Sequence, residues 1–317
     1  MKKTPVICIV GPTAVGKSDV GVALSQRWQG EVISADSMQV YRGMDIGTAK
    51  LSLEERQGIV HHMIDVVSPR TTYTVHDYAM AAREAVQACH HRGHLPMIVG
   101  GTGLYVRAVI DHFDFTQTQK DTTLRDALTR EAEEVGSHRL HERLQGLDRE
   151  AANRIHPHDV RRIVRALEVV LTTGKTMRAN YQQEESPFFP IMIGLTDERN
   201  VLYARIERRM DRMIERGLLE EVRTLLAMGC TSEHTAMQAI GYKELTGVLQ
   251  GEVPLDVAIE QMKQATRRYA KRQLSWFRGD SRIEWYSTPE DGMISENFLT
   301  QIEQTIHRKL SDGASDV

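Results

Sequence analysis

The chain has 317 residues, of which 41% are hydrophobic and 26% are charged, and its formal net charge at pH 7 is −3. This composition is typical of a globular protein with a sizeable core, the length predicts about two domains, and no overall basic charge indicates nucleic-acid binding, although a local patch could provide it. Three widely separated cysteines exclude a disulfide framework, and because no apolar run is long enough for a secretion signal or a membrane span, we expect a cytoplasmic protein.

The first predicted element is a short apolar strand, residues 6–10, followed by the segment 11–18 and a helix over residues 19–28. The middle segment reads GPTAVGKS and matches the pattern G-x-x-x-x-G-K-[ST], which in many proteins binds the phosphates of ATP. Glycines let the backbone wrap an anion, and the helix start adds positive potential. Lys17 is expected to reach the terminal phosphate, and the Ser18 hydroxyl to bind a magnesium ion. The sequence therefore predicts a phosphate-binding loop, without indicating which phosphate it holds.

A second short strand, residues 31–35, leads into a polar, glycine-containing loop over residues 36–50. Ligands of open α/β sheets bind beyond the carboxyl ends of the strands. Asp36 stands at such an end, as the phosphate-binding loop does after the first strand. Its carboxylate is therefore a candidate for chemistry, and the alternative is that Asp36 only caps a helix or forms a turn.

Strands and helices continue to alternate up to residue 105. The predicted elements are a strand over residues 61–66, a helix over 74–91 and a strand over 96–99. The adjacent histidines that begin the first of these strands would point to opposite faces, so we expect surface or packing histidines rather than a metal site. A second glycine-rich turn, GGTGLY at residues 100–105, follows at a strand end. Such a turn can be a simple connection, but its place at the same sheet edge favours a part in the same site.

Residues 116–185 contain no strand-like run and carry charged helical patterns instead. Helices are predicted over residues 124–134, 138–147 and 158–171. The last of them has an apolar stripe from Val160 to Leu171. Arg161, Arg162 and Arg165 lie off this stripe, and their pattern leaves open whether they are solvated or bind phosphates.

The chain returns to a strand at residues 191–195, which favours a helical insertion within one α/β core over two tandem domains. The remaining elements are helices over residues 200–216, 218–228, 235–250, 257–278 and 293–310, and a strand over 283–286. The helix over 257–278 carries five cations with no acid between them, which favours contact with RNA or phosphate over a solvated face. These cations are Arg267, Arg268, Lys271, Arg272 and Arg278. Residues 311–317 are small and polar and predict a disordered end.

Together these elements predict an α/β fold. Its core is P-loop NTPase-like, with a parallel sheet flanked by helices, and an all-helical domain is inserted into it. The predicted core is discontinuous, comprising residues 1–116 and 190–289, and the insertion covers residues 117–189. Residues 290–317 are expected to form a C-terminal helix and a disordered tail.

Two kinds of chemistry suit a phosphate-binding loop, a nearby carboxylate and basic helices. A small-molecule kinase would hold ATP on the loop and use the helical insertion as a lid. A transferase with a diphosphate leaving group would use the loop, the lysine and the metal ion to stabilise the departing charge, while a carboxylate accepts a proton from the nucleophile. Composition and spacing do not separate these two possibilities.

Five segments of the chain also form a recognisable series, namely residues 11–18, 36–50, 100–105, 159–169 and 269–278. In this order they resemble the bacterial tRNA dimethylallyltransferases, also called tRNA isopentenyltransferases (IPP transferases). The resemblance implies transfer of the dimethylallyl group from dimethylallyl diphosphate to the exocyclic amine of the adenine next to the anticodon, on its 3′ side. Diphosphate would be released without use of ATP. The alternatives are an adenylate isopentenyltransferase acting on free AMP or ADP, and a P-loop kinase or RNA-binding NTPase.

The resemblance also implies roles for particular residues. Asp36 would be the general base, with Thr102 and Lys17 as its catalytic partners. The diphosphate would be held by Gly11, Thr13, Ala14, Val15, Gly16, Lys17, Ser18 and Arg223, with Mg²⁺ at Ser18. The anticodon stem-loop of the tRNA would contact Asp36, Ser37, Met38, Gln39, Arg161, Arg162, Ile163, Val164, Arg165, Lys271 and Arg272. No membrane and no obligate protein partner are implied, and we expect a monomer.

Overall fold

The computed structural model describes residues 3–111, 122–180, 185–289 and 294–315. It divides into two compact units, one formed by Met1–Ile110 with Pro187–Val317 and the other by Asp111–Ser186. The insertion therefore spans residues 111–186 in the structure, against 117–189 in the sequence prediction. Its end comes earlier because Phe188 already pairs with Thr4 in the sheet of the larger unit.

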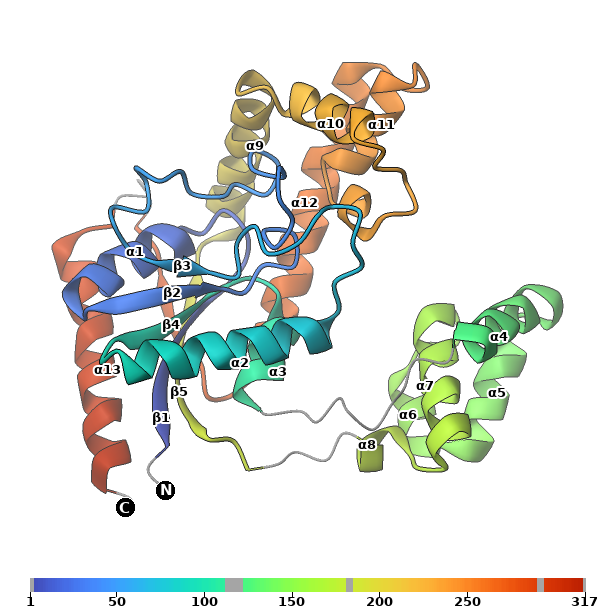
Figure 1. Ribbon diagram of the computed structural model, residues 1–317, viewed down its shortest axis with the longest axis horizontal. Coiled ribbons are helices and arrows are strands. Elements are labelled where there is room, and N and C mark those ends of the chain that lie inside the picture. Colours follow the sequence, from blue (N-terminus) through green and yellow to red (C-terminus); the bar gives the residue numbers. More distant parts are fainter. Residues whose placement is uncertain (1–2, 112–121, 181–184, 290–293, 316–317) are drawn as a thin grey trace. The chain divides into compact units, whose positions relative to one another are not determined.

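The larger unit is built on a parallel sheet with the strand order β3-β2-β4-β1-β5-β6 (Figure 1). The strands are β1 (Thr4–Val10), β2 (Gly30–Ser34), β3 (His61–His62), β4 (Leu95–Gly100), β5 (Phe188–Thr196) and β6 (Glu284–Ser287). The central strands β1, β2 and β4 are almost wholly buried, as expected for parallel strands covered by helices on both faces. The predicted α/β class and parallel sheet are confirmed.

Helices cover both faces of this sheet (Figure 1). The helices of this unit are α1 (Lys17–Arg27), α2 (Val75–His91), α3 (Gly103–Ile110), α9 (Arg199–Glu215), α10 (Leu218–Ala227), the 3-10 turn η1 (Thr235–Gln238), α11 (Tyr242–Leu249), α12 (Leu255–Arg278) and α13 (Glu296–Ser315), of which α10, η1 and α11 pack on other helices and not on the sheet. The sequence prediction missed α3, because its start was attributed to a glycine turn. Alternate residues of β1 enter two different cores. Ile7 and Ile9 pack with α1 and α13, whereas Val6 and Cys8 pack with α2 and α3.

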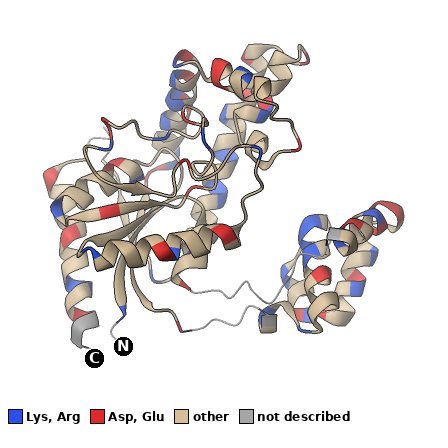
Figure 2. Ribbon diagram, in the orientation of Figure 1, with Lys and Arg blue, Asp and Glu red and all other residues tan. Residues whose placement is uncertain are grey.

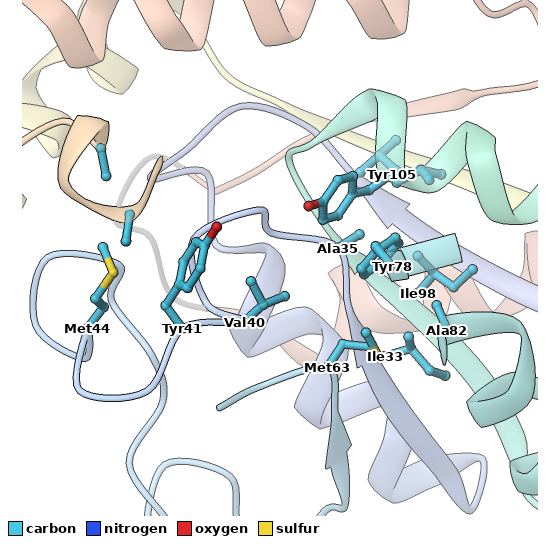
Figure 3. Packing of buried hydrophobic residues seen from close by; sticks show 14 of the residues in the cluster. Ile33, Ala35, Val40, Tyr41, Met44, Met63, Tyr78, Ala82, Ile98 and Tyr105 are labelled. Atoms are coloured by element: carbon cyan, nitrogen blue, oxygen red, sulfur yellow. The ribbon is translucent and has the colours of Figure 1, made fainter. Parts of the chain in front are cut away.

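Figure 3 shows the second of these cores beneath the loop that follows β2. Val40, Tyr41 and Met44 of that loop are buried. The rings of Tyr78 and Tyr105 stack at 3.9 Å between centroids, and the Tyr78 hydroxyl donates a hydrogen bond of 3.0 Å to the backbone oxygen of Ser34. The end of β2, where Asp36 follows, is therefore held by a packed aromatic pair.

Two sequence predictions for this unit were wrong. Strand β3 ends at His62 rather than continuing to residue 66, because Met63 and Asp65 have φ angles of 63° and 57°, which a strand cannot contain. The C-terminal helix continues to Ser315, so residues 311–315 are helical and not disordered. Its Phe298 and Ile302 belong to the core around α1, which makes this helix part of the larger unit.

Helices joined by short turns make up the described residues of the inserted unit, and no strand occurs among them, in agreement with the prediction of an all-helical insertion. Its helices are α4 (Thr122–Val135), α5 (Ser137–Leu147), α6 (Arg149–Arg154), α7 (Val160–Thr173) and α8 (Met177–Asn180). Helix α7 begins where the Asp159 side chain accepts a hydrogen bond from the Arg162 backbone N–H, and it ends at Gly174, which has a φ of 68°. Its apolar face packs against Leu128, Leu140 and Leu144.

Candidate active site

A sharply turned loop connects the end of β1 to the start of α1. Gly11, Ala14 and Gly16 have φ angles of 146°, 65° and 88°, and α1 begins directly afterwards at Lys17. A side chain at Gly11 would place its Cβ 2.3 Å from the backbone oxygen of Leu195, so only glycine fits there. Such a turn at a helix N-terminus presents backbone N–H groups to an anion. Residues 11–18 therefore have the conformation of the predicted phosphate-binding loop.

This loop forms one wall of a cavity of about 510 Å³, which we call the cationic cavity. It is lined by Ala14, Gly16, Lys17, Ser18, Asp19, Ala49, Lys50, Leu51, Glu55, Arg205, Arg208, Arg209, Arg212 and Arg216. The Nζ of Lys17 donates a hydrogen bond of 2.6 Å to the backbone oxygen of Pro12, which keeps the ammonium group at the loop. Val15 is fully buried, so it can offer an anion only its backbone.

The cations of the opposite wall come from α9 and the residue that ends it. The sequence prediction described this segment by its apolar positions alone and missed these arginines. Their recurrence every three to four residues, from Arg205 to Arg216, was the available signal, because that spacing places side chains along one side of a helix. Figure 2 shows the blue basic positions that follow one another along α9.

Arg209 is the central member of this group. It lines the cationic cavity and also a second cavity that contains Asp36. Its Nε is buried and has no hydrogen-bond partner among the described residues. Burial lowers the pKa of Arg209, while the carboxylate of Asp36 acts in the opposite direction. A buried Nε–H without a partner is costly, and an anionic ligand in either cavity could accept a hydrogen bond from it.

Arg223, predicted to hold the distal part of a diphosphate, does not line the cationic cavity. It lies on α10, where its guanidinium pairs with Glu220 on the same helix and its side chain is 55% exposed. Its part in binding a diphosphate therefore stays a prediction. The structure adds Arg209, which does line the cavity.

The pKa of Lys17 depends on its burial and on the charges of Arg209 and Asp36. Burial and the positive charge of Arg209 lower the pKa of Lys17 to about 7, although Asp36 opposes the shift. The ammonium group is therefore close to losing its proton at neutral pH in the absence of a ligand. An incoming anion would favour the charged form and raise this pKa again.

The second cavity, the Asp36 cavity, has a volume of about 240 Å³. Its lining combines a carboxylate, hydroxyls and amides with the apolar side chains of α9 and with the ring of Tyr269. The lining residues are Thr13, Asp36, Ser37, Met38, Gly47, Thr48, Arg209, Met210, Met213, Gln238, Ala239, Ile240, Thr266, Tyr269 and Arg272. This mixture suits a flat, largely apolar group with a few polar edges.

Asp36 is placed by its own turn. Its Oδ1 accepts a hydrogen bond of 2.8 Å from the Met38 backbone N–H, so the residue forms a turn and also faces the cavity. The Thr102 hydroxyl accepts a hydrogen bond of 3.1 Å from the Ser37 backbone N–H. Thr102 is not itself among the residues that line the cavity. In the structure, Thr102 holds the backbone of Ser37, directly after Asp36.

Gln39 was predicted to contact the RNA, but its side chain is hydrogen-bonded within the protein. Its Oε1 accepts a hydrogen bond of 2.8 Å from the Ser34 hydroxyl, and its Nε2 donates one of 3.1 Å to the Thr48 backbone oxygen. The amide is therefore engaged at both ends, and Gln39 does not line the cavity. Ser37 and Met38 do line it.

A buried glutamine, for which the sequence analysis predicted no separate role, joins the two glycine-rich loops. Gln273 of α12 accepts a hydrogen bond of 2.8 Å from the Thr13 backbone N–H and donates one of 3.0 Å to the backbone oxygen of Gly101. A Cβ at Gly101 would lie 2.1 Å from the Gln273 Nε2. The glycine is thus required for the close approach that links the loops after β1 and β4.

Glu221 of α10 holds the loop that borders both cavities. Its carboxylate accepts hydrogen bonds from the backbone N–H groups of Asp45, Ile46 and Gly47 at 2.9, 2.7 and 3.1 Å, and from the Tyr242 hydroxyl at 2.6 Å. Gly47 and Thr48 line the Asp36 cavity, and residues 49–51 line the cationic cavity. One carboxylate therefore positions a wall of each cavity.

Replacing Glu221 by Gln should loosen this loop. An amide group would face backbone donors at one end, which leaves about two hydrogen bonds unmade and costs about 2 kcal/mol of stability. We expect kcat/KM of the reaction that the site catalyses to fall roughly tenfold, because both cavities share the loop. The control is Glu220→Gln on the preceding, exposed position. Steady-state kinetics with thermal unfolding measure both effects, and equal kcat/KM in the two variants would contradict this role.

Some of the α12 cations that were predicted to contact RNA are exposed, and one is paired with an acid of another helix. Lys271 and Arg272 are exposed, and the Arg272 guanidinium lies 5.7 Å from the centre of the Tyr269 ring. Arg267, by contrast, pairs with Glu207 of α9 at 2.7 Å. The sequence showed no acid within this run, but a neighbouring helix supplies one.

The predicted RNA-contacting residues of the inserted unit also differ in their exposure. Arg161 and Arg162 are exposed, and Arg162 is 3.4 Å from the Asp159 carboxylate. Arg165 is half-buried and pairs with Glu168 at 3.0 Å. Ile163 and Val164 are buried in the core of the unit, so the prediction that they contact RNA was wrong for their side chains. Leu171, predicted for the apolar stripe, is 39% exposed.

Comparison with known proteins identifies the family of this chain. The family model described as IPP transferase matches residues 39–280. The chain belongs to the IPP transferase family. This assignment supports the sequence resemblance and disfavours a P-loop kinase. Among the described residues no helix is long and apolar enough to cross a membrane.

Named relatives of this family member cover nearly its whole length. A tRNA dimethylallyltransferase from Carboxydothermus hydrogenoformans is 48% identical over 300 residues, which are 93% of this chain and 96% of that protein. The tRNA dimethylallyltransferase of Oceanobacillus iheyensis is also 48% identical, over 94% of this chain and 95% of its own.

Solved structures show the same fold. The full-length tRNA isopentenylpyrophosphate transferase from Bacillus halodurans matches with a TM-score of 0.74 and 43% identity, and 99% of each chain is covered. A eukaryotic dimethylallyltransferase acting on tRNA matches with a TM-score of 0.76 and 33% identity, over 90% of this chain and 74% of the other.

Proposed function

We propose that this IPP transferase transfers the dimethylallyl group from dimethylallyl diphosphate to the exocyclic amine of an adenine in tRNA, 3′-adjacent to the anticodon. The observation that carries the proposal is the pair of cavities that share Arg209. One is rich in cations and suits a diphosphate, and the other holds a carboxylate among apolar and aromatic side chains. The allylic carbon would lie where the two cavities meet.

The reaction divides between these cavities. The amine nitrogen attacks the first carbon of the allyl group, the bond from that carbon to the diphosphate oxygen breaks, and its electrons leave with the diphosphate. The backbone N–H groups of residues 13–18, Lys17 and Arg209 would stabilise the charge that grows on the leaving group. As the new bond forms, the amine becomes acidic, and Asp36 accepts its proton. An adenine must leave the base stack to enter a cavity of the protein.

Magnesium remains part of the proposal. The hydroxyl of Ser18 and the carboxylate of Asp19 both line the cationic cavity, and oxygen ligands are those that Mg²⁺ prefers. Burial raises the pKa of Asp19, and the charge of Glu55 adds to this effect. A divalent cation beside these acids would favour their ionised forms, so the residues fit the ion. Bound there, it would neutralise part of the charge on the diphosphate.

The experiment that tests the function uses dimethylallyl diphosphate labelled in its allyl group. It is incubated with an anticodon stem-loop that carries adenine 3′ to the anticodon, and with AMP and ADP in parallel reactions. We expect the label to appear in the stem-loop and not in the free nucleotides. Label in AMP or ADP alone would favour the adenylate isopentenyltransferase, for which the helical insertion has no evident use.

The affinity for dimethylallyl diphosphate should depend on pH through the ionisation of Lys17. Since its pKa without ligand is about 7, affinity for dimethylallyl diphosphate should be nearly constant below pH 7 and should fall up to tenfold per pH unit above it. The variant Lys17→Arg keeps its charge at these pH values and should show a flatter profile. Binding titrations from pH 6 to 9 measure both proteins. Parallel profiles would exclude Lys17 as the titrating group.

The exposed arginines of the insertion should contribute to RNA affinity through phosphates. Replacing Arg161 and Arg162 together by Gln should weaken stem-loop binding and reduce the slope of log affinity against log salt by about 1 to 2. Arg165→Gln provides the contrast, because this side chain already pairs with Glu168. An unchanged slope in the double variant would remove both arginines from the RNA interface.

A further inference from the structure

Two methionines of α9 follow Arg209 and form part of the wall of the Asp36 cavity. Met210 and Met213 both line this cavity, and both side chains are buried. Neither can accept a proton or pair with a diphosphate, so the steps of the reaction give them no part. Methionine is a flexible apolar side chain that fills irregular spaces. The two residues therefore provide a surface for an apolar group beside Arg209.

The spacing along α9 places Met213 at the distance of the allyl end. Arg209 and Met213 are four residues apart, so they lie on the same side of the helix with about 6 Å between them. A dimethylallyl group extends roughly 5 Å from the diphosphate oxygen to its methyl carbons, by standard bond lengths. With the diphosphate at Arg209, the methyl carbons would therefore lie against Met213.

Met210 occupies a different part of the wall. It directly follows Arg209, about 100° around the helix axis, so it lies beside the allyl group and not at its end. Its Sδ accepts a hydrogen bond of 3.7 Å from the Thr266 hydroxyl of α12. Met210 is therefore held as a side wall, which leaves Met213 as the residue at the end of the allyl group.

The protein behind Met213 is closely packed. Met213 belongs to the same buried core as Leu218 and Val222 of α10 and Tyr242 of α11. The Tyr242 hydroxyl is fixed in turn by a hydrogen bond of 2.6 Å to Glu221. Because protein interiors have few voids, a side chain in such a core cannot move back without displacing its neighbours.

The volume of the Asp36 cavity also limits the size of the allyl group. An apolar cavity of about 150 Å³ binds one benzene molecule, which corresponds to roughly 25 Å³ for each non-hydrogen atom. The Asp36 cavity, with about 240 Å³, would then hold roughly 10 such atoms, whereas an adenine and a dimethylallyl group together have about 15. Part of the base would remain at the mouth of the cavity, and no free space would be left beyond the allyl group.

We propose that Met213 sets the maximum length of the allyl group that this enzyme transfers. The inference rests on the proposed alkyl transfer and adds the residue that selects among allylic diphosphates. The Met213 side chain ends the space available to a five-carbon group, and a longer group has to push it into the core. Forcing extra methylenes into a packed space is unfavourable. Longer donors are thus rejected by steric exclusion, although their diphosphates are the same.

The test compares two donors, dimethylallyl diphosphate and 3-methylpent-2-enyl diphosphate, whose allyl group is one carbon longer. In wild-type protein the added methylene should lower kcat/KM for alkylation of the stem-loop by roughly 10- to 200-fold. Met213→Ala removes three non-hydrogen atoms from the wall, so the two donors should then differ by less than about tenfold. Met213→Val removes one such atom and should give an intermediate ratio, with less disturbance of the core.

Met262→Ala is the matched control for loss of a buried methionine. Met262 of α12 belongs to the same core as Met213 but is not among the residues that line either cavity. The ratio of kcat/KM for the two donors should therefore stay that of wild type. A partial loss of active protein changes both values equally and leaves the ratio unaffected, so the ratio separates selection by Met213 from structural damage.

Three results would overturn the inference. The first is an unchanged donor ratio in Met213→Ala or, if that variant does not fold, in Met213→Val. The second is a gain for the longer donor in Met262→Ala equal to that in the Met213 variants. The third is a wild-type protein that alkylates the stem-loop with neither donor. In that case the proposed function fails, and the role of Met213 fails with it.

Discussion

Asp36→Asn is expected to lower the single-turnover rate of alkyl transfer by roughly 10²- to 10⁴-fold, the usual contribution of a positioned general base. The amide keeps an oxygen that can accept the hydrogen bond from the Met38 backbone N–H, so the turn should persist. It cannot accept the proton from the adenine amine. Affinity for the RNA should stay within about threefold, because a carboxylate adds little to the binding of a polyanion.

The conditions of this measurement follow from the charges around Asp36. Its carboxylate raises the pKa of Lys17, so removing that charge lowers the Lys17 pKa below about 7. At neutral pH the variant would lose proton acceptance and diphosphate binding together. The comparison should therefore be made near pH 6, where Lys17 is protonated in both proteins. A rate within about threefold of wild type under saturating substrates would show that another group accepts the proton.

Arg209→Ala should have the second large effect. This arginine lines both cavities, and its buried Nε has no hydrogen-bond partner among the described residues. Truncating one side of a buried charge pair typically costs 2–5 kcal/mol, so we expect affinity for dimethylallyl diphosphate to fall by about 10²- to 10³-fold. Arg308→Ala is the matched control. It removes an exposed arginine of α13 that pairs with Glu284, and it should leave this affinity unchanged.

A second readout distinguishes ligand contact from a purely structural role of Arg209. Its positive charge lowers the pKa of Lys17, so Arg209→Ala should shift the fall in diphosphate affinity from about pH 7 to higher pH. Titrations of the two variants and of wild type over pH 6 to 9 measure this shift. A loss of affinity in Arg308→Ala equal to that in Arg209→Ala, or no displacement of the profile, would contradict the assignment.

The larger features of this chain could be predicted because each depends on a local pattern. Buried parallel strands read as continuous apolar runs, and the segment 11–18 carries its glycines and its lysine at a characteristic spacing. The helical insertion was visible as a long stretch without strand-like runs. Asp36 followed from its place at a strand end, where the structure has it in a cavity.

The remaining features depend on contacts between segments that are distant in the sequence. Gln273 joins loops that precede it by 260 and 172 residues, and no local pattern marks a glutamine for that task. Glu221 holds a loop 174 to 176 residues away. Likewise, the spacing of the α9 arginines places them along one side of a helix, but it did not indicate that this side would face the cationic cavity. Tertiary packing decided these positions.

The central claim is that the phosphate-binding loop holds the leaving group of an alkyl transfer and not the phosphates of a nucleotide. The most direct measurement follows diphosphate release, alkylation of the anticodon stem-loop and ATP hydrolysis in one reaction containing dimethylallyl diphosphate and ATP. We predict one diphosphate released for each adenine alkylated, with no hydrolysis of ATP. Turnover of ATP without alkylation of the RNA would contradict the claim.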